Sequence, residues 1–143
     1  MTHSDRRTRP IVLVGYRGVG KSTVGRALAA RLALAFIDTD EIVELSAGRT
    51  IAELFRTIGE QRFRELESAA VRDSLLGARS VISVGGGAIL PEETRRLIAG
   101  RAFCVWLTAP VAELHRRLDS DPRTADSRPS LTGQAPEFEI TRV

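Results

Sequence analysis

Short apolar runs alternate with longer segments of helical periodicity along most of the chain. Each run is short enough to be a buried strand, and glycine or polar residues bound it. The runs are Ile11 to Val14, Ala35 to Ile37, Val81 to Val84, and Ala102 to Leu107. Strands that alternate with helices predict a parallel sheet with right-handed crossovers. We therefore expect an α/β fold in which ligands gather at the carboxyl ends of the strands.

The segments between these runs predict amphipathic helices. After the first run, Val24, Leu28 and Leu32 share one helical face, which we expect to pack on the sheet. Further helices are predicted over 40–46, from 51, over 60–76, from Pro91 as its first turn, and over 111–118. The apolar stripe of the longest helix consists of Phe63, Leu66, Ala70, Val71 and Leu75.

Length and composition favour one folded domain. A chain of 143 residues with 43% hydrophobic and 27% charged residues is typical of a single globular unit. We expect a disordered basic tail over 1–9 and one domain over 10–143. The formal net charge of +3 comes from arginines scattered among acids. This charge suits an anionic ligand and argues only weakly for nucleic acid. Since the sequence shows no basic stripe, no nucleic-acid partner is expected.

The single cysteine, Cys104, lies in the last apolar run and is expected in the core. One cysteine cannot form an internal disulfide, which is compatible with a reducing compartment. The sequence shows no export signal or membrane-spanning run, although it carries an Arg6-Arg7 pair. We expect a cytoplasmic monomer with no membrane partner.

Residues 15–22 read Gly-Tyr-Arg-Gly-Val-Gly-Lys-Ser and match the P-loop pattern G-x-x-x-x-G-K-[ST] directly after a predicted strand. In such a loop, backbone N–H groups and the start of the next helix hold phosphate oxygens. Lys21 is expected to reach the β- and γ-phosphates, and Ser22 to bind Mg²⁺. A plain strand-to-helix turn would require neither the spacing nor the Lys-Ser pair. The sequence therefore predicts a nucleoside triphosphate site.

Two acids, Asp38 and Asp40, follow the second predicted strand. Phosphoryl transfer requires carboxylates near Mg²⁺ and a group that orients the acceptor hydroxyl, and these two could serve both needs. Either could instead cap the helix that follows. The third strand ends in glycine, where many P-loop proteins carry a metal-side acid. This favours Asp38 and Asp40 as the functional acids.

Two further segments could bind an oxygen-rich acceptor. Amides of Gly85, Gly86 and Gly87 could donate to it, because glycine permits close approach, or the three could form a plain turn. Arg64 could hold a carboxylate through its planar fork. Glu60 and Glu67 stand at helical ion-pair spacing from it, however, and could make ordinary surface pairs.

The segment over 121–133 lacks periodicity and is rich in turn formers. It could be a lid that brings Arg123 or Arg128 over the transferring phosphate, or a solvated loop. His3 lies in the tail and His115 on a charged helix, so neither is expected to bind metal.

Taken in order, these segments resemble shikimate kinase, a family of P-loop small-molecule kinases. The resemblance covers about 11–131 and lies in residues 15–25, 38–40, 59–64 with Glu67, 85–87 and Arg128-Pro-Ser-Leu131. It implies a three-layer αβα P-loop kinase fold with a parallel sheet. It also implies transfer of the ATP γ-phosphate to the 3-hydroxyl of shikimate.

The resemblance also assigns roles to residues. It implies that phosphates are held by Gly18, Val19, Gly20, Lys21, Ser22 and Thr23. Mg²⁺ would be bound by Ser22 with support from Asp38. Lys21, Asp40 and Arg128 would be catalytic, and Arg128 would also close from the lid onto ATP. Shikimate would be bound by Asp40, by Arg64 through its carboxylate, and by Gly85, Gly86 and Gly87, with Gly86 donating its amide.

The C-terminus departs from the family pattern. Shikimate kinases continue past the lid through a helix with a second substrate-binding arginine, then a fifth strand and an adenine loop. Here residues 136–143 resemble only the start of that helix. We expect a truncated form with four strands and impaired stability and activity. Two alternatives stay open: another P-loop small-molecule kinase, and a nucleotide-binding module without catalysis.

Overall fold

The computed structural model describes residues 7–120. Strands and helices alternate in it: β1 (Ile11–Val14), α2 (Lys21–Leu32), β2 (Ala35–Asp38), α3 (Thr39–Ala47), α4 (Ile51–Leu76), β3 (Ser80–Ser83), α5 (Glu92–Arg101), β4 (Phe103–Trp106) and α6 (Val111–Ser120). The predicted lid over 121–133, with Arg123 and Arg128, lies outside the described residues. So do residues 1–6 of the predicted tail and the segment over 136–143.

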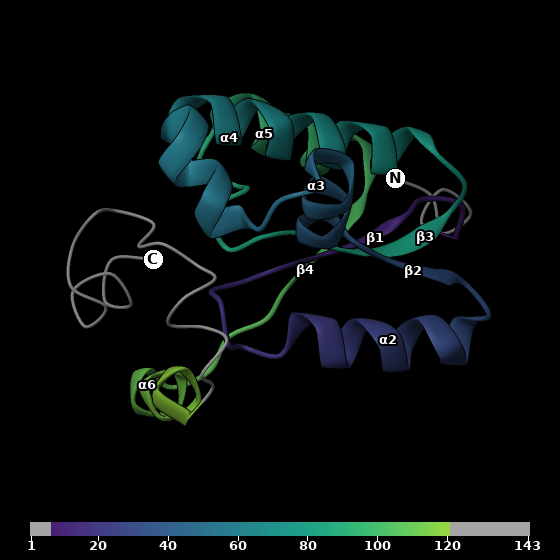
Figure 1. Ribbon diagram of the computed structural model, residues 1–143. Coiled ribbons are helices and arrows are strands. Elements are labelled where there is room, and N and C mark those ends of the chain that lie inside the picture. The colour runs from purple at the N-terminus through teal and green to yellow at the C-terminus, as the bar shows by residue number, and fades with distance from the viewer. Residues whose placement is uncertain (1–6, 121–143) are drawn as a thin grey trace.

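The four described strands form one sheet in the order β2-β3-β1-β4, and every neighbouring pair is parallel. Helices α3, α4 and α5 lie on one side of the sheet and α2 on the other, while α6 lies beyond one end of the strands (Figure 1). The α/β, three-layer arrangement predicted from the sequence is confirmed for this part of the chain. All strand ends that were expected to carry function therefore meet at one edge of the sheet.

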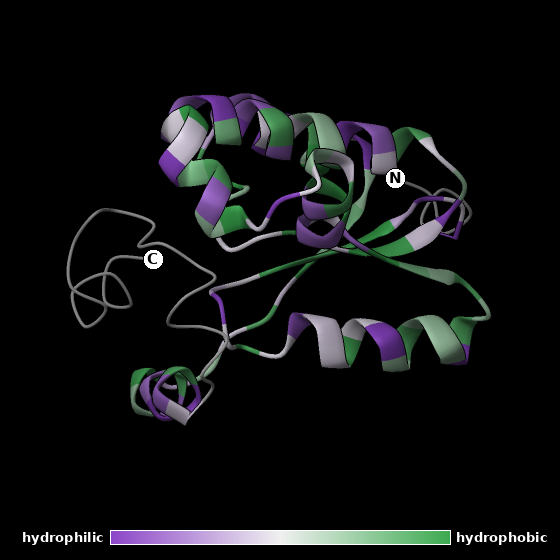
Figure 2. Ribbon diagram, viewed as in Figure 1, coloured by the Kyte–Doolittle hydropathy of each residue, from purple (hydrophilic) through white to green (hydrophobic). Residues whose placement is uncertain are grey.

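The core lies on both faces of the two central strands, β1 and β3. Val12 and Ile82 pack toward α4 and α5, while Leu13 and Val81 pack toward α2, and all four are fully buried. Because helices cover both faces, β1 is apolar throughout and the two central residues of β3 are apolar on both faces, with no alternation. Figure 2 shows mostly apolar strands between helices that carry both polar and apolar residues. No helix in the described range is long and apolar enough to cross a membrane.

Helix α4 has a break at Gly59, whose backbone angles of φ 79° and ψ 170° are not helical. A positive φ of this size strains residues with a side chain, and glycine adopts it easily. Thr50 and Glu53 form a capping box at the start of α4. The separate helices predicted from 51 and over 60–76 are thus confirmed as two parts of one bent element. The second part carries Phe63, Arg64 and Glu67.

The predicted packing face of α2 is only partly correct, because Leu28 packs against the core and the other two residues do not. Val24 and Leu32 are each 42% exposed, and the helix packs instead through Gly25 and Ala29. A Cβ at Gly25 would lie 2.5 Å from the ring of Phe36, so only glycine allows the helix to approach β2 this closely. The contact between α2 and the sheet is therefore determined by small residues, which contribute little to the hydrophobic periodicity of a sequence.

Two other burial predictions fail for related reasons. Leu66 in the predicted stripe of α4 is 41% exposed, and the charged Glu67 beside it is buried. Cys104 is exposed because β4 is the last strand of the described sheet and lacks a neighbour on one side. Pro91 precedes α5 as its N-cap residue instead of forming the first turn.

Candidate functional site

The predicted P-loop connects β1 to α2 at the carboxyl edge of the sheet. Gly18 and Gly20 have φ angles of 81° and 101°, which residues with side chains rarely adopt. Gly20 is the N-cap of α2, and the first turn of that helix holds no acidic residue. The open N–H groups and the positive end of the helix dipole therefore face the loop, which is the arrangement that binds phosphate.

Lys21 is buried and held by the loop itself. Its Nζ donates to the carbonyl oxygen of Gly15 at 2.6 Å and to that of Tyr16 at 3.1 Å. These bonds keep the ammonium group at the wall of the cavity described next, where Lys21 is a lining residue. The ammonium group of Lys21, which the sequence assigned to phosphate binding, therefore lies beside the cavity over the P-loop.

A cavity of about 300 Å³ lies over the P-loop. Its lining residues come from the loop, the ends of β2 and β3, and α6: Gly18, Gly20, Lys21, Ser22, Thr23, Asp38, Asp40, Ser83, Val84, Gly85, Arg117 and Leu118. Of the predicted phosphate-binding and metal-binding residues within the described range, all except Val19 border this one space. Val19 is buried in an apolar cluster with Tyr16 and Leu114.

Ser22 and Asp38 both line this cavity and contact each other. Ser22 Oγ donates to Asp38 Oδ2 at 3.2 Å, while Asp38 Oδ1 accepts from the backbone N–H groups of Asp40 and Glu41 at 2.9 and 3.4 Å. Asp38 therefore caps α3, which was the structural interpretation of its place in the sequence. It also contacts Ser22 in the P-loop helix, as expected of an acid that supports Mg²⁺ binding. One carboxylate performs both tasks because its two oxygens point to different elements.

The donor set at this point fits Mg²⁺. Magnesium prefers oxygen ligands and is usually bound by one or two carboxylates together with substrate phosphates and water. Ser22 and Asp38 offer such oxygens beside the P-loop. Among residues 7–120, no group of three or more His, Cys, Asp and Glu could hold a metal by itself. A phosphate-bearing ligand and water would supply the remaining ligands.

A second cavity adjoins the first and corresponds to the predicted acceptor site. Its lining residues are Arg17, Asp40, Ile51, Phe55, Phe63, Arg64, Glu67, Gly85, Gly86 and Gly87. Asp40 and Gly85 border both cavities. The structure therefore brings Asp40, Arg64 and the three glycines together, as the sequence predicted, and places Asp40 between the two spaces.

Arg64 is fixed by a buried acid and two aromatic rings. Its Nη1 donates to Glu67 Oε1 at 2.8 Å, and Glu67 is only 3% exposed. Burial raises the pKa of Glu67 against the opposing effect of Arg64, and the charge of Asp40 adds to the increase. The Arg64 guanidinium also lies 5.8 and 5.5 Å from the ring centroids of Phe55 and Phe63. Glu67 is thus a buried partner of Arg64 and not a member of a surface pair.

Gly85 and Gly87 are required by the space that neighbouring side chains take. A Cβ at Gly85 would lie 2.7 Å from Asp40 Oδ1 and 2.9 Å from Glu67 Oε2, and one at Gly87 would lie 2.6 Å from Arg64 Nη2. Neither glycine has a positive φ. The reason for these two glycines is therefore close approach, as the sequence suggested, and not a positive φ angle. They allow the two acids and the arginine to lie directly against the backbone.

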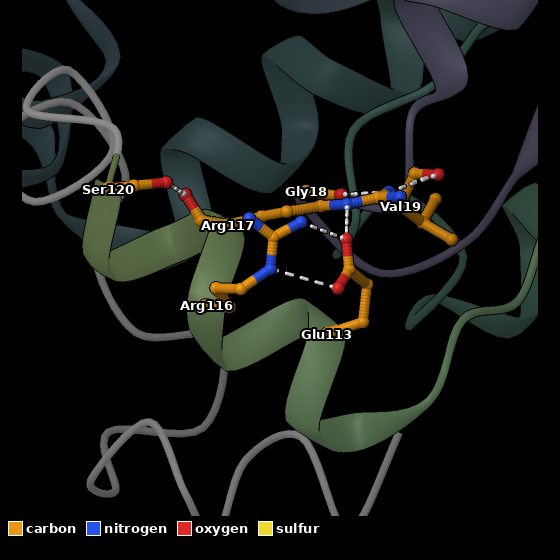
Figure 3. A network of polar contacts seen from close by, with 6 residues as sticks. All are labelled: Gly18, Val19, Glu113, Arg116, Arg117 and Ser120. Carbon is orange, nitrogen blue, oxygen red and sulfur yellow. Dashed lines mark hydrogen bonds and ion pairs between the residues drawn. The ribbon is translucent and has the colours of Figure 1, made fainter.

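Two arginines of the site were not predicted. Arg17 lines the acceptor cavity from an unspecified position of the P-loop pattern, so the pattern gives no signal for it. Arg117 comes from α6, and its Nη1 donates to the carbonyl oxygens of Gly18 and Val19 at 3.1 and 3.3 Å (Figure 3). Glu113 holds Arg117 in this position by accepting from its Nε at 2.8 Å. Arg117 thus adds a positive charge beside the nucleotide cavity.

Comparison with known proteins gives a consistent result. The family model described as "SKI: Shikimate kinase" matches residues 17–143. A shikimate kinase from Rhodopirellula baltica is 42% identical over 143 residues, which are 100% of this chain and 76% of that protein. One from Bradyrhizobium diazoefficiens is 47% identical over 135 residues, which are 94% of this chain and 63% of that protein. The chain thus spans between three fifths and about three quarters of the length of these relatives.

The fold also matches a solved structure. A shikimate kinase from Acinetobacter baumannii in complex with shikimate superposes with a TM-score of 0.86 and is 32% identical in sequence. The match covers 97% of this chain and 75% of that one. Sequence and fold thus agree on the same set of relatives.

Proposed function

Because the chain belongs to the shikimate kinase family, we propose that it transfers the γ-phosphate of ATP to the 3-hydroxyl of shikimate. The products are shikimate 3-phosphate and ADP. The observation that carries the proposal is that Asp40 and Gly85 border both the P-loop cavity and the acceptor cavity. A phosphoryl group passing from one bound molecule to the other must cross at such a junction.

The P-loop supplies the nucleotide half of the site. Backbone N–H groups of residues 18–23 bind the phosphates, and Lys21 exchanges its bonds to the Gly15 and Tyr16 carbonyls for bonds to phosphate oxygens. Ser22 would bind Mg²⁺, and Asp38 would support the ion. When bound, the ion offsets the negative charge of the phosphates. The lid residue Arg128, outside the described residues, would add charge over the phosphates.

The acceptor half of the site orients the nucleophile. Arg64, held by Glu67, binds the shikimate carboxylate, and the Gly86 amide donates to the same molecule. Asp40 accepts a hydrogen bond from the attacking hydroxyl and takes its proton as the oxygen attacks the γ-phosphorus. The bond from that phosphorus to the β–γ bridging oxygen breaks, and ADP leaves. Positioning and charge stabilisation supply the rate enhancement.

A coupled assay of ADP release tests this function. We expect the unaltered chain with ATP and Mg²⁺ to release ADP only when shikimate is added, and other polyol acids to give much lower turnover. In the Lys21→Ala variant kcat should fall by a factor of at least about 100, since one charged group at the transferring phosphate contributes about 3 kcal/mol. Nucleotide binding by folded protein without shikimate-dependent ADP release would favour a non-catalytic module instead.

The composition offers an independent readout of the nucleotide site. Lys21 is the only lysine in the chain, whose other basic side chains are arginine and histidine. Amine-directed acetylation followed by peptide mapping therefore reports on Lys21 alone among side chains. We expect saturating Mg·ADP to protect Lys21 from acetylation. Equal labelling with and without Mg·ADP would contradict the proposed phosphate site.

A further inference from the structure

The loop between β3 and α5 lines the acceptor cavity with its backbone. Gly85, Gly86 and Gly87 border this cavity. Glycine loses more conformational freedom on folding than any other residue, so a run of three needs contacts that fix its peptide groups. Because glycines have no side chain, hydrogen bonds that fix them are made through the backbone.

Two consecutive turns fold this loop. The N–H of Ala88 donates to the carbonyl oxygen of Gly85 at 3.0 Å. The N–H of Leu90 donates to the carbonyl oxygen of Gly87 at 3.1 Å. The Gly87 carbonyl and the Ala88 N–H belong to one planar peptide group, so the second bond orients the group that makes the first. The position of Gly85 thus depends on the peptide group between Ile89 and Leu90.

Arg95 of α5 holds that last peptide group. Its Nη1 donates to the carbonyl oxygen of Ile89 at 2.7 Å and to that of Leu90 at 2.6 Å. Helix α5 has no side-chain cap at its N-cap residue, Pro91, and Arg95 is its fourth residue. A cation near the N-terminus of a helix is disfavoured by the helix dipole. The two bonds to the loop carbonyls offset this cost.

A continuous chain of hydrogen bonds therefore runs from a cation to the acceptor cavity. It starts at Arg95 Nη1 and passes through the Ile89–Leu90 and Gly87–Ala88 peptide groups. It ends on the carbonyl oxygen of Gly85, and the N–H of that same peptide group belongs to Gly86. Every peptide group in the chain accepts at its carbonyl and donates through its N–H. Each bond therefore polarises the next in the same direction, and the charge of Arg95 adds to the effect.

We propose that Arg95 is a positioning residue for the acceptor: through this chain it orients the Gly86 N–H and strengthens it as a donor to the substrate. This inference rests on the proposed function, in which the Gly86 amide binds shikimate, and adds the residue that controls that amide. Gly86 borders the acceptor cavity and not the nucleotide cavity. Loss of Arg95 should therefore weaken the binding of shikimate and leave that of ATP unchanged.

Substitution of two neighbouring arginines of α5 tests the proposal. The variant is Arg95→Met, and the matched control is Arg96→Met, whose side chain is 78% exposed and pairs with Glu92 at the surface. We expect Arg95→Met to raise KM for shikimate about 10-fold. This is the lower end of the effect of a hydrogen bond to a charged group, because Arg95 is exposed. KM for ATP should change less than about threefold, and Arg96→Met should match the unaltered chain in both values.

Arg95→Lys keeps the charge and loses the planar fork, so its KM for shikimate should lie between those of the unaltered chain and Arg95→Met. Binding of Mg·ADP by calorimetry establishes that each variant is folded. A merely structural role of Arg95 would change the unfolding free energy without separating the two KM values. An unchanged KM for shikimate, or an equal rise in KM for shikimate and for ATP, would overturn the role of Arg95.

Amide hydrogen exchange gives a readout that is independent of turnover. The N–H groups of Ala88 and Leu90 should exchange faster in Arg95→Met than in Arg96→Met, because the chain that holds them has lost its first bond. The N–H of Leu13, in the buried strand β1, should exchange equally in both variants. Equal exchange of Ala88 and Leu90 in the two variants would contradict the proposal.

The two proposals fail in different ways. If the unaltered chain releases no ADP with shikimate, the proposed function is wrong. Calorimetric titration of shikimate then decides the role of Arg95 separately. Weaker binding by Arg95→Met than by Arg96→Met, together with faster exchange of the Leu90 N–H, supports that role. Equal binding by the two variants, or no binding by any of the proteins, overturns it.

Discussion

Ser22 and Asp38 are joined by a hydrogen bond of 3.2 Å that links the first turn of α2 to the end of β2. The second oxygen of the same carboxylate caps α3 through the N–H groups of Asp40 and Glu41. The candidate metal ligand, the P-loop helix and the helix that carries Asp40 thus share one side chain. Substitutions of Asp38 can therefore separate the stability of the protein from metal binding. The α3 cap requires only an acceptor oxygen, whereas the proposed Mg²⁺ site requires the negative charge of the carboxylate.

Asp38→Asn and Asp38→Ala should differ in stability and agree in metal dependence. Asn keeps the capping oxygen, whereas Ala removes it at a cost of about 1 kcal/mol in unfolding free energy. Both lose the negative charge, so the Mg²⁺ concentration for half-maximal activity should rise about 10-fold or more in each. Urea unfolding and a magnesium titration of turnover measure the two effects. If Asp38→Asn left the magnesium dependence of turnover unchanged, Asp38 would not be part of the metal site.

Gly87→Ala should damage the acceptor site alone. Its Cβ would meet the Arg64 guanidinium, which Glu67 prevents from moving freely. We expect KM for shikimate to rise about 10-fold or more, with KM for ATP unchanged, since small displacements of a positioning group are costly. Gly100→Ala is the control, because a Cβ there meets nothing within 4 Å and the position is helical. That variant should keep full activity and gain about 0.5–1 kcal/mol in stability. Equal behaviour of the two variants would contradict the packing argument.

Arg117→Ala should weaken ATP binding, and Arg116→Ala should not. Both side chains bind Glu113, whose pKa they lower to about 2, so these ion pairs persist at ordinary assay pH. Only Arg117 also contacts the P-loop carbonyls and lines the nucleotide cavity (Figure 3). We expect about a 10-fold rise in KM for ATP for the first variant, the effect of one charge-assisted contact, and less than threefold for the second. The ratio of the two values is the decisive measurement.

Glu67 should make stability depend on pH in a direction opposite to that of a surface acid. Burial raises its folded-state pKa above the ordinary value of 4.5, so the unfolded chain releases its proton first as pH rises. The unaltered chain should therefore lose stability relative to Glu67→Gln from about pH 4.5 upward, and the difference should level off above the folded-state pKa. Urea unfolding of both proteins between pH 4 and pH 8 measures it. A difference that grows in favour of the unaltered chain would contradict the burial argument.

Local patterns were enough to predict most of the fold. The four strands lie within one residue of their predicted positions, and the break at Gly59 separates the two helices as expected. The apolar runs that form strands are contiguous, and the P-loop motif occupies eight successive positions. Such signals are readable because each depends on neighbours in the sequence.

Predictions of burial were weaker because they depend on which element packs against which. The periodicity of α2 marked Val24 and Leu32, yet the closest approach to the sheet is made at Gly25. Cys104 has an apolar neighbourhood in sequence and lies exposed on β4. Hydropathy identifies residues that favour burial and carries no information on whether a neighbouring element covers them.

By itself the sequence determined the parallel α/β sheet, the phosphate-binding loop and the set of acids, arginine and glycines expected around it. Only the tertiary structure decided that Asp40 lies between two cavities, that Glu67 is buried against Arg64, and that Arg17 and Arg117 belong to the site. The Arg117 contact to Gly18 joins residues 99 positions apart. Long-range contacts of this kind arise from chain topology, which brings the carboxyl ends of separate parallel strands to one edge, and no local spacing records them.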